Sequence, residues 1–161
     1  MIQFELEQPT MEDIVSMCKD LAPQIKLFRP SCILAIGYGG IFPAALIGKE
    51  LGLPIHVIRV SRYDDDCERT DVTLLDTKYS GKLMSSNMHI VVVDDVADTG
   101  VSLDIVYQHL RAIGIPHKNI EFCTLHLKKT SKVIPRWYAT ITDKWILYPW
   151  ESTQPQNDRT S

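Results

Sequence analysis

The chain has 161 residues and a mass of 18.3 kDa, which fits one domain built around one hydrophobic core. Hydrophobic residues make up 45% and charged residues 23% of the sequence, a globular balance that argues against disordered, coiled-coil and fibrous classes. With a net charge of −3, the protein lacks the overall positive charge that attracts proteins to nucleic acids or acidic membranes. Small molecules are therefore the expected ligands.

The N-terminal residues MIQFELEQ lack the basic and apolar regions of a secretory signal. No apolar run approaches the roughly 20 residues that span a bilayer, and we therefore expect a cytoplasmic protein. Thr10 followed by Asp13 is typical of a helix start, and apolar residues then recur at helical spacing, which predicts a helix over residues 10–27.

The middle of the chain alternates apolar runs with glycine turns and helical patterns. The predicted strands are 31–37, 54–63, 89–97 and 119–127, and the predicted helices are one that ends at Gly52 and one over 101–114. Alternating buried strands and helices favour an α/β fold with a mostly parallel central sheet flanked by helices, whose ligands bind at the carboxyl ends of the strands. We expect a single domain over residues 1–150.

Two segments do not fit the alternation. Residues 62–88 are too polar and irregular for a core, although VTLL within them favours a short ribbon strand, and a loop of this length is typical of a functional lid. The last residues, 151–161, read as a disordered tail.

The stretch HIVVVDDVADTGVS gathers three acids beside a turn that opens a helix. Thr99 and Ser102 offer hydroxyls, Gly100 allows close approach of the backbone, and the free amides of a first helical turn attract phosphate. The stretch lacks both the GxxxxGK[ST] and the GxGxxG pattern, which excludes a nucleoside triphosphatase loop and a dinucleotide fingerprint.

Asp94 and Asp95 end the predicted strand at 89–97. Adjacent residues of an extended strand project to opposite faces, so the pair cannot simply act as one acid and one base. Such carboxylates suit vicinal hydroxyls or a hard divalent cation, and the structural alternative is that they cap local amides.

Five segments together resemble type I phosphoribosyltransferases, most closely the bacterial xanthine-guanine branch. VVVDDVADTGVS resembles the phosphoribosyl-pyrophosphate (PRPP) signature of that family. The matching segments before and after it are ILAIGYGGIFPAALIGKELG, VSRYDDDCER, TLHLKK and DKWILYPWE, so the resemblance spans roughly residues 31 to 151. It implies the type I fold, with a flexible lid over 62–88 and a small purine-binding hood.

The resemblance assigns roles within the PRPP signature. It implies that Asp94 and Asp95 face the ribose hydroxyls and the magnesium side of PRPP, with Asp95 nearer to the Mg²⁺ ion. It also implies that Asp98 lies beside N7 of the purine as proton acceptor or stabiliser. The implied 5-phosphate turn consists of Val96, Ala97, Asp98, Thr99, Gly100, Val101 and Ser102.

The resemblance also predicts a purine pocket that binds a 6-oxopurine base. It implies that Lys128 donates to O6, that Trp145 stacks on the ring and that the main chain of Ile146 faces the 2-position. Taken alone, Lys128 reads as a surface lysine and Trp145 as a core aromatic, but their order after the PRPP motif favours the pocket.

The loop from Gly37 to Gly40 fits a pyrophosphate site, because bare backbone amides can converge on phosphate oxygens. Tyr38, beside Gly39, stands where the family usually carries an arginine, so a charge-assisted contact is missing. Weaker PRPP binding, altered specificity, or compensation by Arg62 or Arg69 would follow. Arg69 matches a lid arginine of the family that contacts PRPP, although it also reads as an exposed loop cation.

The predicted function is a magnesium-dependent purine salvage enzyme that joins guanine, xanthine or hypoxanthine to PRPP and releases pyrophosphate. The alternative is a non-catalytic PRPP or nucleotide sensor of the same fold. The expected partners are PRPP and a purine base, without nucleic acid or membrane, and we expect a homodimer or a homotetramer.

Overall fold

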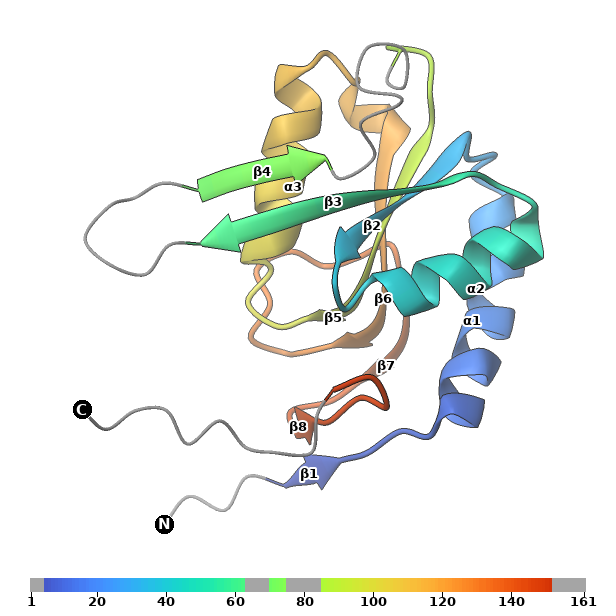
Figure 1. Cartoon of the computed structure of the whole chain (residues 1–161), viewed down its shortest axis with the longest axis vertical. Helices are drawn as coiled ribbons and strands as arrows, with labels where there is room; N and C mark the ends of the chain where they lie inside the picture. Colours follow the sequence, from blue (N-terminus) through green and yellow to red (C-terminus); the bar gives the residue numbers. More distant parts are fainter. Residues whose placement is uncertain (1–4, 63–69, 75–84, 152–161) are drawn as a thin grey trace.

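The computed structural model describes residues 5–62, 70–74 and 85–151. Its centre is a six-stranded sheet with the strand order β4-β3-β2-β5-β6-β7, shown in Figure 1. All neighbouring strands are parallel except β4, which runs antiparallel to β3. The strands are β2 (Cys32–Gly37), β3 (Ile55–Arg62), β4 (Thr70–Leu74), β5 (Ile90–Ala97), β6 (Ile120–Leu127) and β7 (Trp137–Ile141).

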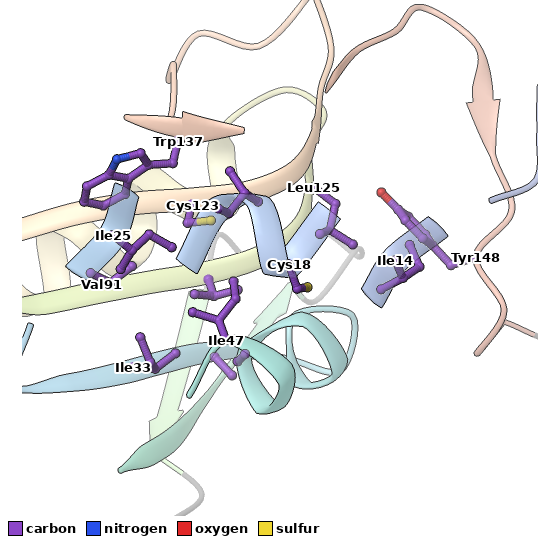
Figure 2. Packing of buried hydrophobic residues seen from close by; sticks show 14 of the residues in the cluster. Ile14, Cys18, Ile25, Ile33, Ile47, Val91, Cys123, Leu125, Trp137 and Tyr148 are labelled. Atoms are coloured by element: carbon purple, nitrogen blue, oxygen red, sulfur yellow. The ribbon is translucent and has the colours of Figure 1, made fainter. Parts of the chain in front are cut away.

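Helices cover both faces of this sheet. Helices α1 (Met11–Lys26) and α2 (Ile41–Leu51) pack on one face, where buried residues such as Ile14 and Ile47 meet Ile33 and Val91, as Figure 2 shows. Helix α3 (Val101–Ala112) packs on the other face through Leu103, Val106 and Leu110. Because both faces are covered, the central strands β2 and β5 are apolar along their buried length.

The helix ends follow from local chemistry. Thr10 caps α1 in a reciprocal capping box, in which its hydroxyl accepts from the Asp13 amide and the Asp13 carboxylate accepts from the Thr10 amide. Helix α2 ends at Gly52, whose φ of 66° is a left-handed conformation that glycine adopts without steric cost.

A second, small sheet lies beyond the main one and forms the hood. It pairs β1 (Leu6–Glu7) in parallel with β8 (Trp145–Ile146), so the start of the described chain lies beside its end. A short 3-10 helix, η2 (His117–Asn119), precedes β6.

The structure confirms the predicted fold class and the helix over 10–27, to within a residue at each end. It also confirms the short ribbon strand, which is β4. Strand β7 was not predicted, because as an edge strand it exposes Tyr138 and Ile141 and so lacks a clear apolar pattern.

Other expectations fall partly or wholly outside the described residues. Most of the predicted lid lies there, including Arg69, and so does the tail beyond Glu151. Within the ranges that are described, no helix is long and apolar enough to cross a membrane.

Candidate active site

The three central parallel strands end at one edge of the sheet, and the predicted site residues follow these ends. The predicted pyrophosphate loop (residues 37–40) follows β2, the acidic stretch closes β5, and Lys128 follows β6. The Lys128 amide donates to the Ala97 carbonyl at 2.9 Å, which joins the last two segments directly. The topology therefore gathers residues that lie up to about 90 positions apart in the sequence.

The turn between β5 and α3 encloses a cavity of about 60 Å³. Its lining contains every residue of the predicted 5-phosphate turn. The lining residues are Asp94, Val96, Ala97, Asp98, Thr99, Gly100, Val101, Ser102 and Leu103. Because the cavity opens at the first turn of α3, the free amides of that turn and the partial positive charge of the helix favour an anion.

Gly100 is required at this turn for two reasons. Its φ of 84° lies in the left-handed region, and a Cβ there would lie 2.7 Å from the Val133 amide nitrogen. The segment after Lys128 packs against the same turn, where the Thr130 hydroxyl donates to the Asp98 carbonyl at 3.1 Å and the Lys132 amide donates to the Thr99 carbonyl at 3.0 Å. These contacts fix the backbone of the turn, while the Asp98 and Thr99 side chains remain exposed.

Asp94 and Asp95 lie on opposite faces of β5. Asp94 lines the 60 Å³ cavity, whereas the Asp95 carboxylate lies against the backbone of Gly39. Each carboxylate accepts from the next amide along the chain, Asp94 from Asp95 at 2.9 Å and Asp95 from Val96 at 2.7 Å. The amide-capping alternative therefore describes part of what these acids do, and their binding of ribose hydroxyls or a cation stays a prediction.

Both acids have raised pKa values. Burial raises the pKa of Asp94 well above its usual range, and the neighbouring charge of Asp95 adds to the effect. Burial also raises the pKa of Asp95, against the lowering effect of the Val96 amide. Two carboxyl groups held in this way suit a divalent cation or ribose hydroxyls. Either partner would offset the free energy that is needed to keep the carboxylates charged where water is partly excluded.

The pyrophosphate loop is built closely around Asp95. A Cβ on Gly39 would overlap the Asp95 carboxylate, and a Cβ on Gly40 would overlap the Val93 carbonyl oxygen. The peptide bond between Gly37 and Tyr38 is cis. Glycines 39 and 40 thus let the loop lie directly on the end of β5.

Tyr38 projects from this loop with 65% of its surface exposed. The guanidinium carbon of Arg59, on β3, lies 5.4 Å from the centroid of the Tyr38 ring. Sequence reasoning missed Arg59, whose only signal was a cation between the apolar residues Ile58 and Val60 of a predicted strand.

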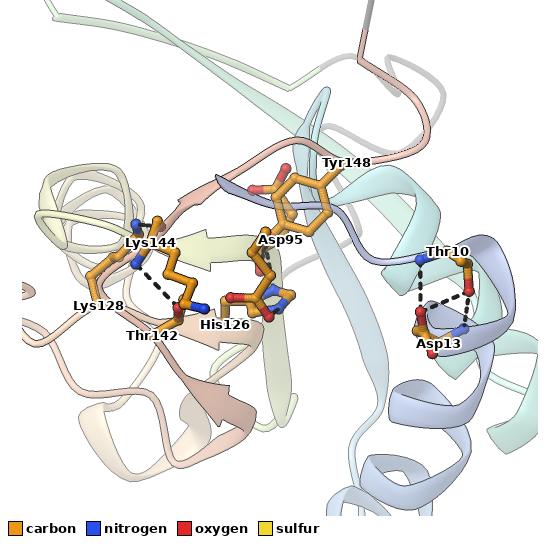
Figure 3. Close-up of polar contacts among 9 residues, drawn as sticks. Thr10, Asp13, Asp95, His126, Lys128, Thr142, Lys144 and Tyr148 are labelled. Atoms are coloured by element: carbon orange, nitrogen blue, oxygen red, sulfur yellow. Dashed lines mark hydrogen bonds and ion pairs between the residues drawn. The ribbon is translucent and has the colours of Figure 1, made fainter. Parts of the chain in front are cut away.

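A buried polar chain ties the hood to Asp95 (Figure 3). The Tyr148 hydroxyl donates to the Asp95 carbonyl at 3.0 Å, and the Nδ1 atom of His126 lies 2.8 Å from that hydroxyl. Since the hydroxyl has one hydrogen, which the carbonyl takes, His126 Nδ1 must be the donor. The other ring nitrogen, Nε2, faces the Glu7 carboxylate of β1 at 3.5 Å.

Stacked aromatic rings hold the segment after β8, residues 148–150, against α2. The Trp150 ring stacks on Tyr148 and on Phe42, with centroids 4.8 Å apart and planes within 6° in each pair. The Glu151 carboxylate then accepts from the Tyr148 amide at 2.9 Å. The aromatic residues of YPWE were the available sequence signal for this anchor, but sequence reasoning used this segment only for the family resemblance.

The three predicted purine residues lie near one another. Lys128 donates through Nζ to the carbonyl of Lys144, the residue before β8 (Figure 3). Trp145, the first residue of β8, is 62% exposed. The amides of Trp145 and Leu147 donate to the carbonyls of Glu5 and Glu7, so the main chain of Ile146 points away from β1. Lys128, the exposed ring of Trp145 and the main chain of Ile146 thus lie near one another at the start of β8.

Two further expectations concern cations. Arg69 lies outside the described residues, and only the backbone of Arg62 is described. Among the described residues, no group of three or more histidine, cysteine, aspartate or glutamate side chains is arranged to hold a metal ion. A metal at Asp95 would therefore take most of its ligands from a bound substrate or from water.

Comparisons with known proteins agree with this arrangement. Residues 11–156 match the family model described as the phosphoribosyl transferase domain. The chain is 30% identical over 184 aligned residues to the hypoxanthine-guanine phosphoribosyltransferase of Saccharomyces cerevisiae, covering 88% of this chain and 83% of that protein.

Solved structures agree as well. A purine phosphoribosyltransferase from Pyrococcus horikoshii superposes with a TM-score of 0.81 at 28% identity, over 93% of this chain and 97% of its own. A Neisseria gonorrhoeae protein with bound ppGpp superposes with a TM-score of 0.78 at 25% identity, over 95% of this chain and 93% of its own. The chain therefore belongs to the phosphoribosyltransferase family and has the fold of a type I phosphoribosyltransferase.

Proposed function

We propose that this chain is a purine salvage enzyme that joins a 6-oxopurine base to PRPP, giving the nucleoside 5′-monophosphate and pyrophosphate. The observation that carries the proposal is the common edge of the sheet. There the cavity at the turn after β5, the half-buried Asp94 and Asp95, the glycine loop and the exposed Trp145 of the hood lie together. The hypoxanthine-guanine activity named for the yeast relative supports the choice of base.

The reaction breaks the bond between the anomeric carbon and pyrophosphate and forms a bond from that carbon to a purine nitrogen. Positive charge develops on the ribose as the bond breaks, so the protein must hold two charged fragments in line and exclude water. The turn over residues 96–102 would hold the 5-phosphate, and the loop over residues 37–40 would face the departing pyrophosphate. Asp98 would accept or stabilise the purine proton near N7.

Magnesium fits the donor set at the end of β5. Burial raises the pKa values of Asp94 and Asp95, so a bound cation would stabilise their charged forms. We assign the metal side to Asp95, the acid that lies against the pyrophosphate loop. When bound, Mg²⁺ would supply positive charge beside the pyrophosphate group.

The purine side of the site would select the base. Lys128 would turn from the Lys144 carbonyl to O6 of the purine, Trp145 would stack on the ring, and the Ile146 main chain would face the 2-position. These groups count against the alternative of a PRPP sensor, because a protein that bound PRPP alone would not need them. Arg69 remains the proposed lid contact to PRPP.

A product assay tests the function. The protein is incubated with PRPP, Mg²⁺ and guanine, xanthine, hypoxanthine or, as a control, adenine, and nucleotide and pyrophosphate are separated by chromatography. We expect equal amounts of both products with at least one 6-oxopurine and little with adenine. Binding of PRPP without nucleotide from any base would instead support the sensor.

Location and assembly remain predictions. We propose a cytoplasmic enzyme that forms a homodimer or a homotetramer. Cell fractionation would test the first statement, and light scattering after size-exclusion chromatography would test the second.

A further inference from the structure

The pyrophosphate loop carries Tyr38 in the place where the resemblance leads us to expect an arginine. Pyrophosphate bears several negative charges, and the fork of N–H donors on arginine matches two phosphate oxygens at once. A tyrosine hydroxyl can donate one hydrogen bond but brings no positive charge. A cation that reaches the loop from another element would supply the missing charge.

Arg59 is placed to do this. In the β2–β3 ladder it lies opposite Gly37, the residue at which β2 ends and the loop begins. Its side chain is exposed, and its guanidinium carbon lies 5.4 Å from the centroid of the Tyr38 ring. This distance is within the range of a cation–π contact, so the aromatic ring holds the cation next to the loop.

The contact leaves the guanidinium able to bind an anion. An aromatic face attracts the charge of arginine without accepting its directed N–H bonds, so the donors remain available. Among the residues that the structure describes, no carboxylate forms an ion pair with Arg59. The charge is therefore presented to solvent at the loop and is not neutralised by a described neighbour.

The loop also adjoins the acid to which we assign the metal side. Gly39, one residue beyond Tyr38, lies directly against the Asp95 carboxylate. A pyrophosphate group bound at this loop would thus lie between two groups. Asp95 would be on the Gly39 side, and the Arg59 guanidinium would be on the Tyr38 side. Three elements, β2, β3 and β5, contribute to this one location.

We propose that Arg59 binds the pyrophosphate group of PRPP, and that Tyr38 positions it by holding its guanidinium at the loop. The arginine expected in the loop is thereby replaced by an arginine from the adjacent strand. This inference rests on the proposed function, since it names the residue that handles the leaving group. It differs from compensation by Arg62 or Arg69, which the sequence suggested.

Binding of inorganic pyrophosphate with Mg²⁺, measured by titration calorimetry, tests the proposal without requiring turnover. Arg59→Ala should weaken this binding about ten- to a hundredfold, the loss expected for one charge-assisted contact, and Arg59→Lys should lose less. In the activity assay the Michaelis constant for PRPP should rise by a similar factor, and that for the purine should change less than about threefold. Unchanged pyrophosphate affinity in Arg59→Ala would overturn the proposal.

Arg136 offers a matched control. It precedes β7 at the opposite end of the sheet, and its guanidinium carbon lies 5.1 Å from the Trp137 ring centroid. Arg136→Ala therefore removes the same charge and the same kind of aromatic contact away from the loop, together with an ion pair to Glu121 at 2.8 Å. Equal weakening of pyrophosphate by Arg136→Ala and Arg59→Ala would show only an effect of net charge, and would also overturn the proposal.

Substitutions at Tyr38 test the role of its ring. Tyr38→Ala removes the platform and should weaken pyrophosphate about three- to tenfold, on the order of one cation–π contact, whereas Tyr38→Phe keeps the ring and should lose less. If both variants lost the same pyrophosphate affinity, the Tyr38 hydroxyl and not its ring would be responsible. That result would contradict the role of the ring in positioning Arg59.

A double-mutant cycle tests the replacement itself. Tyr38→Arg should restore pyrophosphate affinity in the Arg59→Ala background and should gain much less in the wild-type background. Equal gains in both backgrounds would mean that the two positions act independently, which would contradict the replacement. If the wild type binds pyrophosphate through Arg59 but forms no nucleotide, the proposed function fails while this site stands.

Discussion

At the scale of single residues, Asp98 carries the most direct prediction. It ends the acidic stretch beside the 5-phosphate turn and its side chain is exposed, whereas Asp94 and Asp95 are partly covered. Asp98→Asn should lower turnover about ten- to a thousandfold and leave PRPP affinity within a few-fold, because a proton acceptor acts mainly on the transition state. Steady-state kinetics and calorimetry would measure both quantities, and unchanged turnover would remove Asp98 from the mechanism.

Gly39 gives a second prediction at this scale. A Cβ at this position would overlap the Asp95 carboxylate, so Gly39→Ala must displace either the acid or the loop. We expect PRPP affinity in the presence of Mg²⁺ to fall by about tenfold or more, since contacts to a charged ligand are lost.

Gly114→Ala is the control for this substitution. Gly114 has a φ of 98°, a Cβ added to it would meet nothing within 4 Å, and it lies between α3 and β6, away from the loop. Its replacement should cost about 1 kcal/mol in the free energy of unfolding without weakening PRPP. If Gly39→Ala, like Gly114→Ala, lowered the free energy of unfolding but kept the affinity for PRPP, the contact between Gly39 and Asp95 would have no role in binding.

At the scale of elements, His126 connects the hood to the main sheet. Burial lowers its pKa, while the Glu7 carboxylate of β1 opposes that shift and the nearby charge of Lys128 adds to it. The Tyr148 hydroxyl lies 2.8 Å from Nδ1 of the His126 ring. Burial is the largest of these effects, so the pKa of His126 lies below its usual value.

This shift predicts how stability depends on pH. The pKa of His126 in the folded protein lies below its unfolded value of about 6.5. Between these two pKa values the unfolded chain binds more protons than the folded protein, so the free energy of unfolding should fall as the pH drops below about 6.5. One group can contribute at most about 1.4 kcal/mol per pH unit. Urea unfolding between pH 7.5 and 5 would measure the slope for the wild type and for His126→Asn, which keeps an N–H donor for Tyr148. Identical slopes would show that His126 does not titrate on unfolding.

At the scale of the whole molecule, ligand binding should stabilise the fold because the site joins separate strands. At PRPP concentrations about a hundred times the dissociation constant, the gain is about 2.7 kcal/mol. For a domain of this size we expect the melting temperature to rise by roughly 5 to 11 °C. Differential scanning calorimetry with PRPP, with and without Mg²⁺, would measure this rise. Asp95→Ala should reduce the part of the rise that depends on Mg²⁺, and an equal rise in that variant would contradict the metal-side assignment.

The sequence by itself determined the layered fold and the place of the candidate site along the chain. Continuous apolar runs such as CILAI required strands covered on both faces, and Gly52 and Gly114 marked where α2 and α3 stop. The residues of the 5-phosphate turn were also readable, because strand, turn and helix follow one another within a short stretch of chain. Local chemistry and short-range order carry this information.

Only the tertiary structure decided which distant side chains meet. Arg59 and Tyr38 are 21 positions apart, and they meet because β2 and β3 pair in a register that sets Arg59 beside the loop. The chain from Glu7 through His126 and Tyr148 to Asp95 joins four segments whose separations carry no pattern. Such contacts depend on strand register and packing of the whole molecule, which no local stretch of sequence specifies.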